Sequence, residues 1–208
     1  ETGYLWTTQN FDAMGNIITT PDPAYLPVIP EKQLEYMVDY TREVMKAGGK
    51  GVIFWEPAWV STPCRTPWGQ GSSHDHVVFF DPVNTNFMEN GGGRWTEPLF
   101  YENINSVKVT FKVNMAGQDV SKGVYLAGDM IDGATPVAMA HLGNSIYSWF
   151  TYISPGDSGA FYFLNDTLPG ARESVPLSCA LWNSTDRKYK ISETNEEYSF
   201  NWGSCEFS

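Results

Sequence analysis

Two glutamates in aromatic settings are the first candidates for chemistry in this sequence. Glu1 is followed by Tyr4 and Trp6, and Glu56 directly follows Trp55. Hydrolysis of a glycosidic bond uses two carboxyl groups that flank the bond, about 5–5.5 Å apart when the anomeric configuration is retained. Because the chain carries 24 Asp and Glu residues, residue type and spacing alone favour a surface or salt-bridged role for both glutamates.

The stretch from Glu31 to Ala47 predicts an amphipathic helix upstream of Glu56. Pro30 is a helix start signal, and Gly48 with Gly49 is a stop signal. The apolar residues fall at offsets that share one helical face: Leu34, Met37, Val38, Val44 and Met45. We therefore expect this face to be buried.

A buried strand is predicted directly after this helix. Residues 52–54 form a continuous apolar run, which is typical of a parallel strand covered on both faces. Pro57 cannot continue a central strand, so the strand should end near Trp55 and Glu56. A helix followed by such a strand is typical of (β/α)8 barrels, whose chemistry lies at the C-terminal ends of the strands.

The pattern changes after a long irregular region over residues 61–104. From Val107 to Met115 apolar and polar residues alternate, which predicts a half-buried strand. Further short apolar segments, separated by Gly, Asn, Asp and Pro, bring the expected number of strands to six or seven. The predicted fold class is a fragment of a (β/α)8 barrel (its last strands and helix) in residues 1–100, followed by an antiparallel β-sandwich in residues 105–208.

The composition narrows the classes of partner. The formal net charge of -11 argues against nucleic acid, because phosphate binding needs clustered Lys and Arg. No apolar run approaches the roughly 18 residues of a membrane-spanning helix. The aromatic content of 15% fits either stacking on sugar rings or an aromatic β core equally well.

The three cysteines leave the disulfide pattern open, because an odd count weakens a disulfide framework. Cys179 and Cys205 flank the last predicted strands and are the candidate pair. A bridge between them would indicate an oxidising compartment. We expect Cys64, next to Pro63, to be a free thiol.

Two motifs on either side of the predicted helix resemble glycoside hydrolase family 53, the endo-β-1,4-galactanases that act on arabinogalactan. The sequence ETGYLW at residues 1–6 resembles the family's Glu-Thr-x-Tyr motif at the end of barrel strand seven. The sequence GVIFWEPAW at residues 51–59 resembles its Gly-Val-x-x-Trp-Glu-Pro-Ala-Trp motif at strand eight. The resemblance covers roughly residues 1–100 and implies the last quarter to third of a retaining (β/α)8 glycosidase.

The resemblance also implies site residues. Glu1 matches the catalytic nucleophile, which would attack the anomeric carbon and form a covalent glycosyl-enzyme. The general acid would be a Glu at the end of strand four, which lies outside this chain. Trp55 matches a sugar-stacking platform. Further substrate-binding candidates are Tyr4, Trp6, Glu56 and Trp59, with loop packing as the alternative for Tyr4 and Trp59.

Some members of the family hold calcium in the loop after strand seven. Here that loop reads NFDAMGN, in which Asn10, Asp12 and Asn16 could supply oxygens. Met14 stands where the resemblance places His, and a thioether is a poor ligand for a hard cation. We therefore predict no cofactor, with calcium at Asp12 and Asn16 as the alternative. We expect residues 74–76, His-Asp-His, to form a solvated loop rather than a metal site.

The second half of the chain resembles the starch-binding-like immunoglobulin-type modules of polysaccharide enzymes. VTFKVNM at residues 109–115 and GVYLAGDM at residues 123–130 carry this likeness. Exposed aromatic residues of such modules stack on sugars. Trp149, Trp182 and Trp202 are the candidates, although we expect each of them to be buried. A spacer without a glycan site is the alternative role.

Together these features predict a piece of a longer enzyme that is secreted, periplasmic or on the cell surface. We interpret the start at Glu1, without an initiator methionine, as a cut through that enzyme. Its partner would be β-1,4-galactan or arabinogalactan, and its oligomeric state stays open. We expect the chain to be inactive by itself, because the acid and most of the cleft are missing. The alternative is a non-catalytic carbohydrate-binding or spacer module attached to a barrel remnant.

Overall fold

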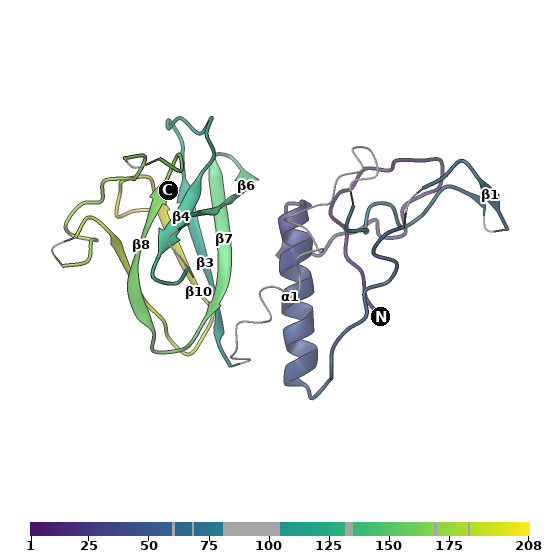
Figure 1. The fold of residues 1–208 in the computed structure, drawn as a ribbon, viewed down its shortest axis with the longest axis horizontal. Coiled ribbons are helices and arrows are strands. Elements are labelled where there is room, and N and C mark those ends of the chain that lie inside the picture. Colours follow the sequence, from purple (N-terminus) through teal and green to yellow (C-terminus); the bar gives the residue numbers. More distant parts are fainter. Residues whose placement is uncertain (60, 68, 81–104, 132–134, 169, 183) are drawn as a thin grey trace. The chain divides into compact units, whose positions relative to one another are not determined.

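The chain divides into two compact units, Glu1–Ile104 and Asn105–Ser208 (Figure 1). The computed structural model describes residues 1–59, 61–67, 69–80, 105–131, 135–168, 170–182 and 184–208. Of the irregular region expected over residues 61–104, residues 81–104 lie outside the described residues.

The described part of the first unit contains one α-helix and little sheet. A short 3₁₀ turn, η1 (Pro23–Tyr25), precedes α1 (Pro30–Lys46). Two short strands, β1 (Arg65–Thr66) and β2 (Gly69–Gln70), pair antiparallel. The predicted helix is therefore present, one residue earlier at each end than the sequence signals suggest.

The buried face of α1 differs from the predicted one. Leu34 and Val44 are only half-buried and Met45 is exposed, whereas Met37 and Val38 are buried as expected. The buried stripe instead includes polar side chains: Gln33, Glu35, Thr41 and Arg42. The predicted buried face is therefore wrong in part: the face that is buried includes polar residues. The helix packs against loop backbone, and the carbonyl groups of that backbone need hydrogen-bond donors such as Gln33.

The predicted strand over residues 52–54 is reduced to a single parallel bridge between Thr2 and Phe54. The Thr2 N–H donates to the Ile53 carbonyl at 2.9 Å, and the Trp55 N–H donates to the Thr2 carbonyl at 2.8 Å. Ile53 is 67% exposed. The segment is therefore not covered on both faces, as expected for a barrel strand whose neighbouring strands are absent from this chain.

A small aromatic core holds the first unit together. Tyr4, Leu5 and Val77 form its buried centre. The rings of Tyr4 and Tyr36 stack at 4.1 Å between centroids, and Tyr25 meets both of them edge-on. This core joins the segment that begins at Glu1 to α1 and to the loop that contains Val77.

The second unit consists of two four-stranded sheets (Figure 1). The first has the order β10-β3-β7-β6, from Glu196–Asn201, Val107–Asn114, Ile146–Ile153 and Ala140–Gly143. The second has the order β5-β4-β8-β9, from Val137–Ala138, Tyr125–Gly128, Ser158–Leu164 and Arg187–Lys190. All pairs are antiparallel except β10 with β3. The expectation of a purely antiparallel arrangement is wrong at this pair, because the chain changes sheets between β9 and β10 and then runs beside β3 in the same direction.

Both sheets contribute to one apolar core. The inward side chains of β3 are almost completely buried, in the alternating pattern expected from the sequence: Val107, Val109, Phe111 and Val113. Phe161 from β8 meets Phe111 edge-on at 4.9 Å between ring centroids. Burial of about 25 cal/mol per Å² of apolar surface is the main source of stability for such a core.

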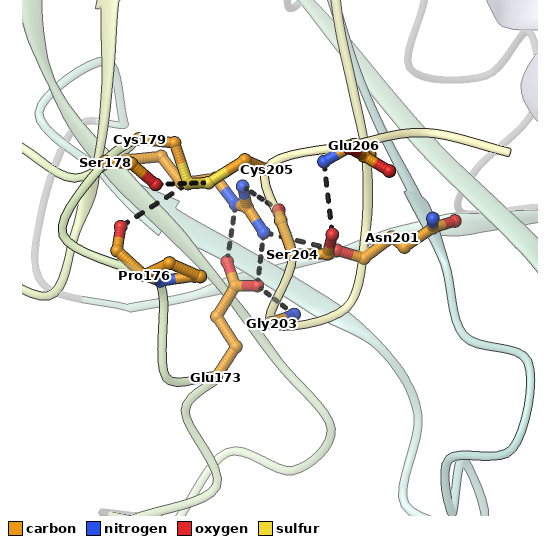
Figure 2. Close-up of a disulfide and its surroundings, with 10 residues drawn as sticks. Glu173, Pro176, Ser178, Cys179, Asn201, Gly203, Ser204, Cys205 and Glu206 are labelled. Atoms are coloured by element: carbon orange, nitrogen blue, oxygen red, sulfur yellow. Dashed lines mark hydrogen bonds and ion pairs between the residues drawn. A yellow bond between two sulfur atoms is a disulfide. The ribbon is translucent and has the colours of Figure 1, made fainter.

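A disulfide joins Cys179 to Cys205 beside a buried ion pair (Figure 2). The two Cα atoms are 5.5 Å apart. Next to the bridge, the Arg187 guanidinium donates to both carboxylate oxygens of Glu173. Cys64 is an exposed free cysteine. This corner connects the C-terminal segment to the loop that contains Cys179.

Candidate active-site elements

Glu1 lies at the start of a backbone segment that runs parallel to residues 53–55. The Thr2–Phe54 bridge aligns the two segments, so that Glu1 and Trp55 belong to neighbouring, parallel pieces of chain. Both side chains are exposed. In a parallel sheet, residues that follow adjacent strands gather at one edge, where they can act on the same ligand.

Glu56 has a positive φ of 49° although it is not a glycine. Non-glycine residues in the left-handed region are uncommon, and they cluster at functional sites. The chain turns here: the Trp59 N–H donates to the Glu56 carbonyl, and the Phe79 N–H donates to the Pro57 carbonyl. The Glu56 side chain is exposed.

Tyr4 is placed differently from the other predicted substrate contacts. Its side chain is only 5% exposed, and its hydroxyl accepts a hydrogen bond from the Asp22 N–H at 3.0 Å. Burial is the largest cause that raises the pKa of this phenol. In this unit the Tyr4 side chain therefore packs between loops, and its role as a substrate contact stays a prediction.

Trp6 presents a hydrogen-bond donor that none of the described residues accepts. Its ring stacks on Phe11 at 5.7 Å between centroids, and its Nε1–H is buried. A buried donor without an acceptor is unfavourable by about 1–3 kcal/mol.

Trp55 and Trp59 are the exposed aromatic residues of the GVIFWEPAW segment, at 43% and 40% exposure. The Trp59 ring lies 5.9 Å from the His74 ring, at an interplanar angle of 34°. The His74 backbone N–H donates to the Ser72 hydroxyl at 3.0 Å. The two tryptophans offer apolar ring faces of the kind on which sugars stack.

Gln33 is a supporting residue that sequence reasoning missed. Its Nε2 lies 2.7 Å from the Tyr4 carbonyl oxygen and 3.0 Å from that of Val77, with Val78 at 3.3 Å. The side chain is completely buried. A glutamine in a helix reads as a solvent-facing residue, so the sequence offered no signal for this contact.

Asp12 ties two loops together. Its Oδ1 accepts from the Met14 N–H at 2.7 Å, and its Oδ2 accepts from the Ser61 hydroxyl and the Ser72 N–H, both at 2.6 Å. Burial would raise the pKa of this carboxyl, but the three donors together lower it. Asp12, a candidate calcium ligand in the sequence analysis, thus also joins its own loop to the segments that contain Ser61 and Ser72.

Residues 74–76 do not form a solvated loop, so that expectation is wrong. Asp75 and His76 are completely buried, because the His76 ring inserts between loops and its Nε2 lies 3.3 Å and 3.1 Å from the N and O of Ile18. Burial, followed by the charge of Asp12, raises the pKa of Asp75.

Two buried side-chain oxygens accept no hydrogen bond among the described residues: Asp75 Oδ1, which lies close to Asp12, and Asn16 Oδ1. The Ser61 hydroxyl reaches Oδ2 of Asp12 and of Asp75, at 2.6 and 3.5 Å, so the two carboxylates are close. Adjacent carboxylates with orphaned oxygens fit a hard cation such as Ca²⁺. Met14 contributes no oxygen, and the described residues contain no group of three or more His, Cys, Asp or Glu placed to hold a metal.

The tryptophans of the second unit separate into two kinds. Trp149 and Trp202 pack against the core as expected. Trp182 is 89% exposed, so the expectation of burial is wrong for this residue. It lies on a loop rather than on a strand, where strand alternation no longer dictates which side chains point inward.

Comparison with known proteins separates the two units. Residues 1–90 match Glycosyl hydrolase family 53. An arabinogalactan endo-beta-1,4-galactanase of Cellvibrio japonicus (strain Ueda107) is 49% identical over 88 residues, which are 41% of this chain and 23% of that protein. The chain thus spans under a quarter of the length of this curated relative.

Two solved structures show weak likeness to about half of the chain. The family 15 glucoamylase of Hypocrea jecorina is 18% identical, with a TM-score of 0.36 over 47% of this chain and 17% of its own. The glucoamylase of Hormoconis resinae is 15% identical, with a TM-score of 0.35 over 50% of this chain and 18% of its own. TM-scores below 0.5 support no inference about fold or ligand.

The described residues contain no helix long and apolar enough to cross a membrane. The resemblance to family 53 is thus confirmed over residues 1–90, which match the model of this family and are similar to the galactanase of Cellvibrio japonicus.

Proposed function

We propose that this chain is part of a retaining endo-β-1,4-galactanase that hydrolyses arabinogalactan, with Glu1 as its nucleophile. The observation that carries the proposal is the parallel alignment of the Glu1–Thr2 segment with residues 53–55, within the region that matches family 53. This alignment is what two consecutive strands of a (β/α)8 barrel would have at their C-terminal ends. Residues 1–100 would then be a barrel fragment.

In the proposed reaction the Glu1 carboxylate attacks the anomeric carbon while an acid outside this chain protonates the leaving oxygen. The acid then acts as a base, and water releases the sugar from Glu1 with retained configuration. Trp55 and Trp59 would stack on sugar rings. The half-buried Trp6 would present the accessible part of its ring, and the Glu56 carboxylate would accept a hydrogen bond from a sugar hydroxyl.

The reaction itself uses no cofactor, since two carboxyl groups suffice. A bound calcium would have a structural role, with Asp12 and Asn16 as the candidate oxygen donors and Asp75 close to Asp12. It would neutralise the two neighbouring carboxylates and fix the loop after Trp6.

The proposal predicts that the 208-residue chain does not hydrolyse soluble β-1,4-galactan, because its partner carboxyl group is absent. In the longer protein that contains it, Glu1→Gln should lower kcat by about 10³-fold or more, as expected when a covalent nucleophile is removed. Reducing-sugar release measures both, and NMR of the first product gives its anomeric configuration. Glu43→Gln, on the exposed side of α1, is the control and should keep full activity.

An inverted product, or full activity of the Glu1→Gln protein, would contradict the nucleophile assignment. Activity of the isolated chain would contradict the need for an external acid.

For the second unit we propose a β-sandwich module over residues 105–208 that holds polysaccharide near the catalytic unit. The exposed Trp182 favours this role over that of a spacer. Secretion, or placement in the periplasm or at the cell surface, is supported by the Cys179–Cys205 disulfide, since such bonds persist in oxidising compartments.

A further inference from the structure

The Gln33 side chain of α1 lies where three backbone carbonyl groups meet. Its Nε2 is 2.7 Å from the Tyr4 oxygen, 3.0 Å from the Val77 oxygen and 3.3 Å from the Val78 oxygen. All four residues are completely or almost completely buried. Carbonyl oxygens that are brought together away from water are unfavourable unless a donor lies between them. Gln33 therefore holds together segments that would otherwise separate.

The first of these segments carries Glu1. Its Thr2 pairs with Phe54 through a single bridge, and two residues further on the Tyr4 carbonyl accepts from Gln33. The residue between these two anchors is a glycine, whose backbone has no side chain to restrict it. The direction of the Glu1 segment therefore depends on both anchors.

The second segment reaches the chain around Glu56. The Phe79 N–H, one residue after the last of the three carbonyls, donates to the Pro57 carbonyl at 2.9 Å. The Phe79 ring also lies 4.1 Å from the Phe54 ring, measured between centroids. Gln33 thus connects to both sides of the parallel bridge, through Tyr4 on one side and through the Phe79 segment on the other.

We propose that Gln33 is a positioning residue for the nucleophile, because its amide group sets how the Glu1 carboxylate is placed relative to residues 55–56. The inference rests on the proposed role of Glu1 as the nucleophile of a retaining glycosidase. Gln33 is buried and acts through the Tyr4 backbone, not on the reacting atoms. A displacement of a reacting group by about 1 Å can lower a rate about 100-fold.

Covalent labelling of Glu1, in the longer protein that contains this chain, measures how the carboxylate is placed. The probe is a dinitrophenyl 2-deoxy-2-fluoro-β-1,4-galactobioside. A Glu1 oxygen forms a bond to the anomeric carbon while the bond to the phenolate oxygen breaks, and dinitrophenolate leaves with the bonding electron pair. This leaving group needs no acid, and the fluorine slows the release of the sugar by water, so the labelled protein accumulates. Mass spectrometry counts the labelled molecules and locates the label.

Gln33→Leu removes the donor and keeps the side-chain volume, and Gln9→Leu is the same substitution at an exposed position. Gln33→Leu should lower the maximal first-order rate constant of labelling by about 10–100-fold. The probe concentration that gives half the maximal rate should stay within about twofold, because most cleft loops of such a barrel lie outside this chain. Labelling should still reach one sugar per molecule, since a misplaced nucleophile reacts slowly but completely. Gln9→Leu should label at the unaltered rate.

Gln33→Asn is the second variant, for the case that Gln33→Leu does not fold. It keeps an amide group, but its reach is one methylene shorter, so it can donate to only some of the carbonyls. Its rate constant should lie between those of Gln33→Leu and the unaltered protein, again with one sugar per molecule.

The same labelling separates a positioning role from a structural one. A rate constant equal to that of the unaltered protein in the Gln33 variants, whether or not fewer molecules are labelled, would overturn the inference and leave the nucleophile assignment standing. A higher half-saturating concentration with an unchanged rate constant would also overturn it, because Gln33 would then act on substrate binding. No label on Glu1 in the unaltered protein would contradict the proposed function itself.

Discussion

Among single residues, Arg187 is completely buried and yet bonds through all three of its guanidinium nitrogens. Its Nε and Nη2 donate to the Glu173 carboxylate at 2.8 and 2.7 Å, and its Nη1 donates to the Ser204 carbonyl at 2.8 Å. The guanidinium also lies over the Phe200 ring, 4.1 Å from its centroid. Two ions removed from water in this way depend on each other, because no solvent can take the place of the missing partner.

Replacing Arg187 with Met should therefore lower the free energy of unfolding by about 3–5 kcal/mol, since Glu173 is left charged and buried. Lys188→Met, at the exposed neighbouring position, should change it by no more than about 0.5 kcal/mol. Urea denaturation followed by far-UV circular dichroism measures both. The double variant Glu173→Leu/Arg187→Met should recover part of the loss, and a double variant less stable than Arg187→Met would contradict this account.

At the scale of elements, the Gln33 amide group ties α1 to two loop segments, in addition to the packing of α1 in the aromatic core. The Gln33 side chain donates to the carbonyl of Tyr4, which follows Glu1, and to the carbonyl of Val77, in the loop after Trp59. Gln33→Leu keeps the side-chain volume but removes the donor, so these buried carbonyls lose their partner at about 1–3 kcal/mol.

The melting temperature of the first unit should fall accordingly in Gln33→Leu, as measured by calorimetry. Gln9→Leu makes the same substitution at an exposed position and should leave it unchanged. An unchanged melting temperature in Gln33→Leu would mean that α1 is held by its apolar contacts, such as Met37 and Val38, alone.

Some elements could be predicted from the sequence because their signals are local. The start and end of α1 follow from Pro30 and Gly48, and the burial of β3 follows from the alternation between Val107 and Val113. The pairing of the Glu1 segment with residues 53–55 followed from the family motifs. The roles expected for Glu1 and Glu56 stay predictions.

The features that could not be predicted depend on contacts between distant residues. Asp75 and His76 look like a solvent-facing loop until the loop that contains Ile18 covers them. Gln33 and Arg187 are polar residues whose burial requires partners 29 and 14 positions away. The parallel position of β10 likewise depends on a change of sheet, which no turn signal in the sequence marks.

Across the whole molecule, the two units should unfold separately, because each has its own core cluster. The Cys179–Cys205 bridge closes a loop with a sequence separation of 26 and lies entirely in the second unit. Reduction should therefore lower the free energy of unfolding of that unit by about 3–4 kcal/mol. Calorimetry with and without a reductant should move one transition and leave the other in place. A shift of both transitions would show that the units unfold together, and Cys64→Ser, which keeps the disulfide, should behave like the unaltered chain.

The corner around Arg187 also decides where the second unit can be trimmed when it is transplanted onto another protein. Asn201 and Ser204 supply backbone carbonyls to the guanidinium, Gly203 supplies an N–H to the Glu173 carboxylate, and Cys205 supplies half of the disulfide. Deleting the residues after Phe200 would leave the eight strands of the second unit nearly intact. The Glu173–Arg187 pair would nevertheless lose its backbone partners, and Cys179 would become a free thiol. A shortened protein that contains only the second unit must therefore extend past Cys205, although the last strand ends at Asn201.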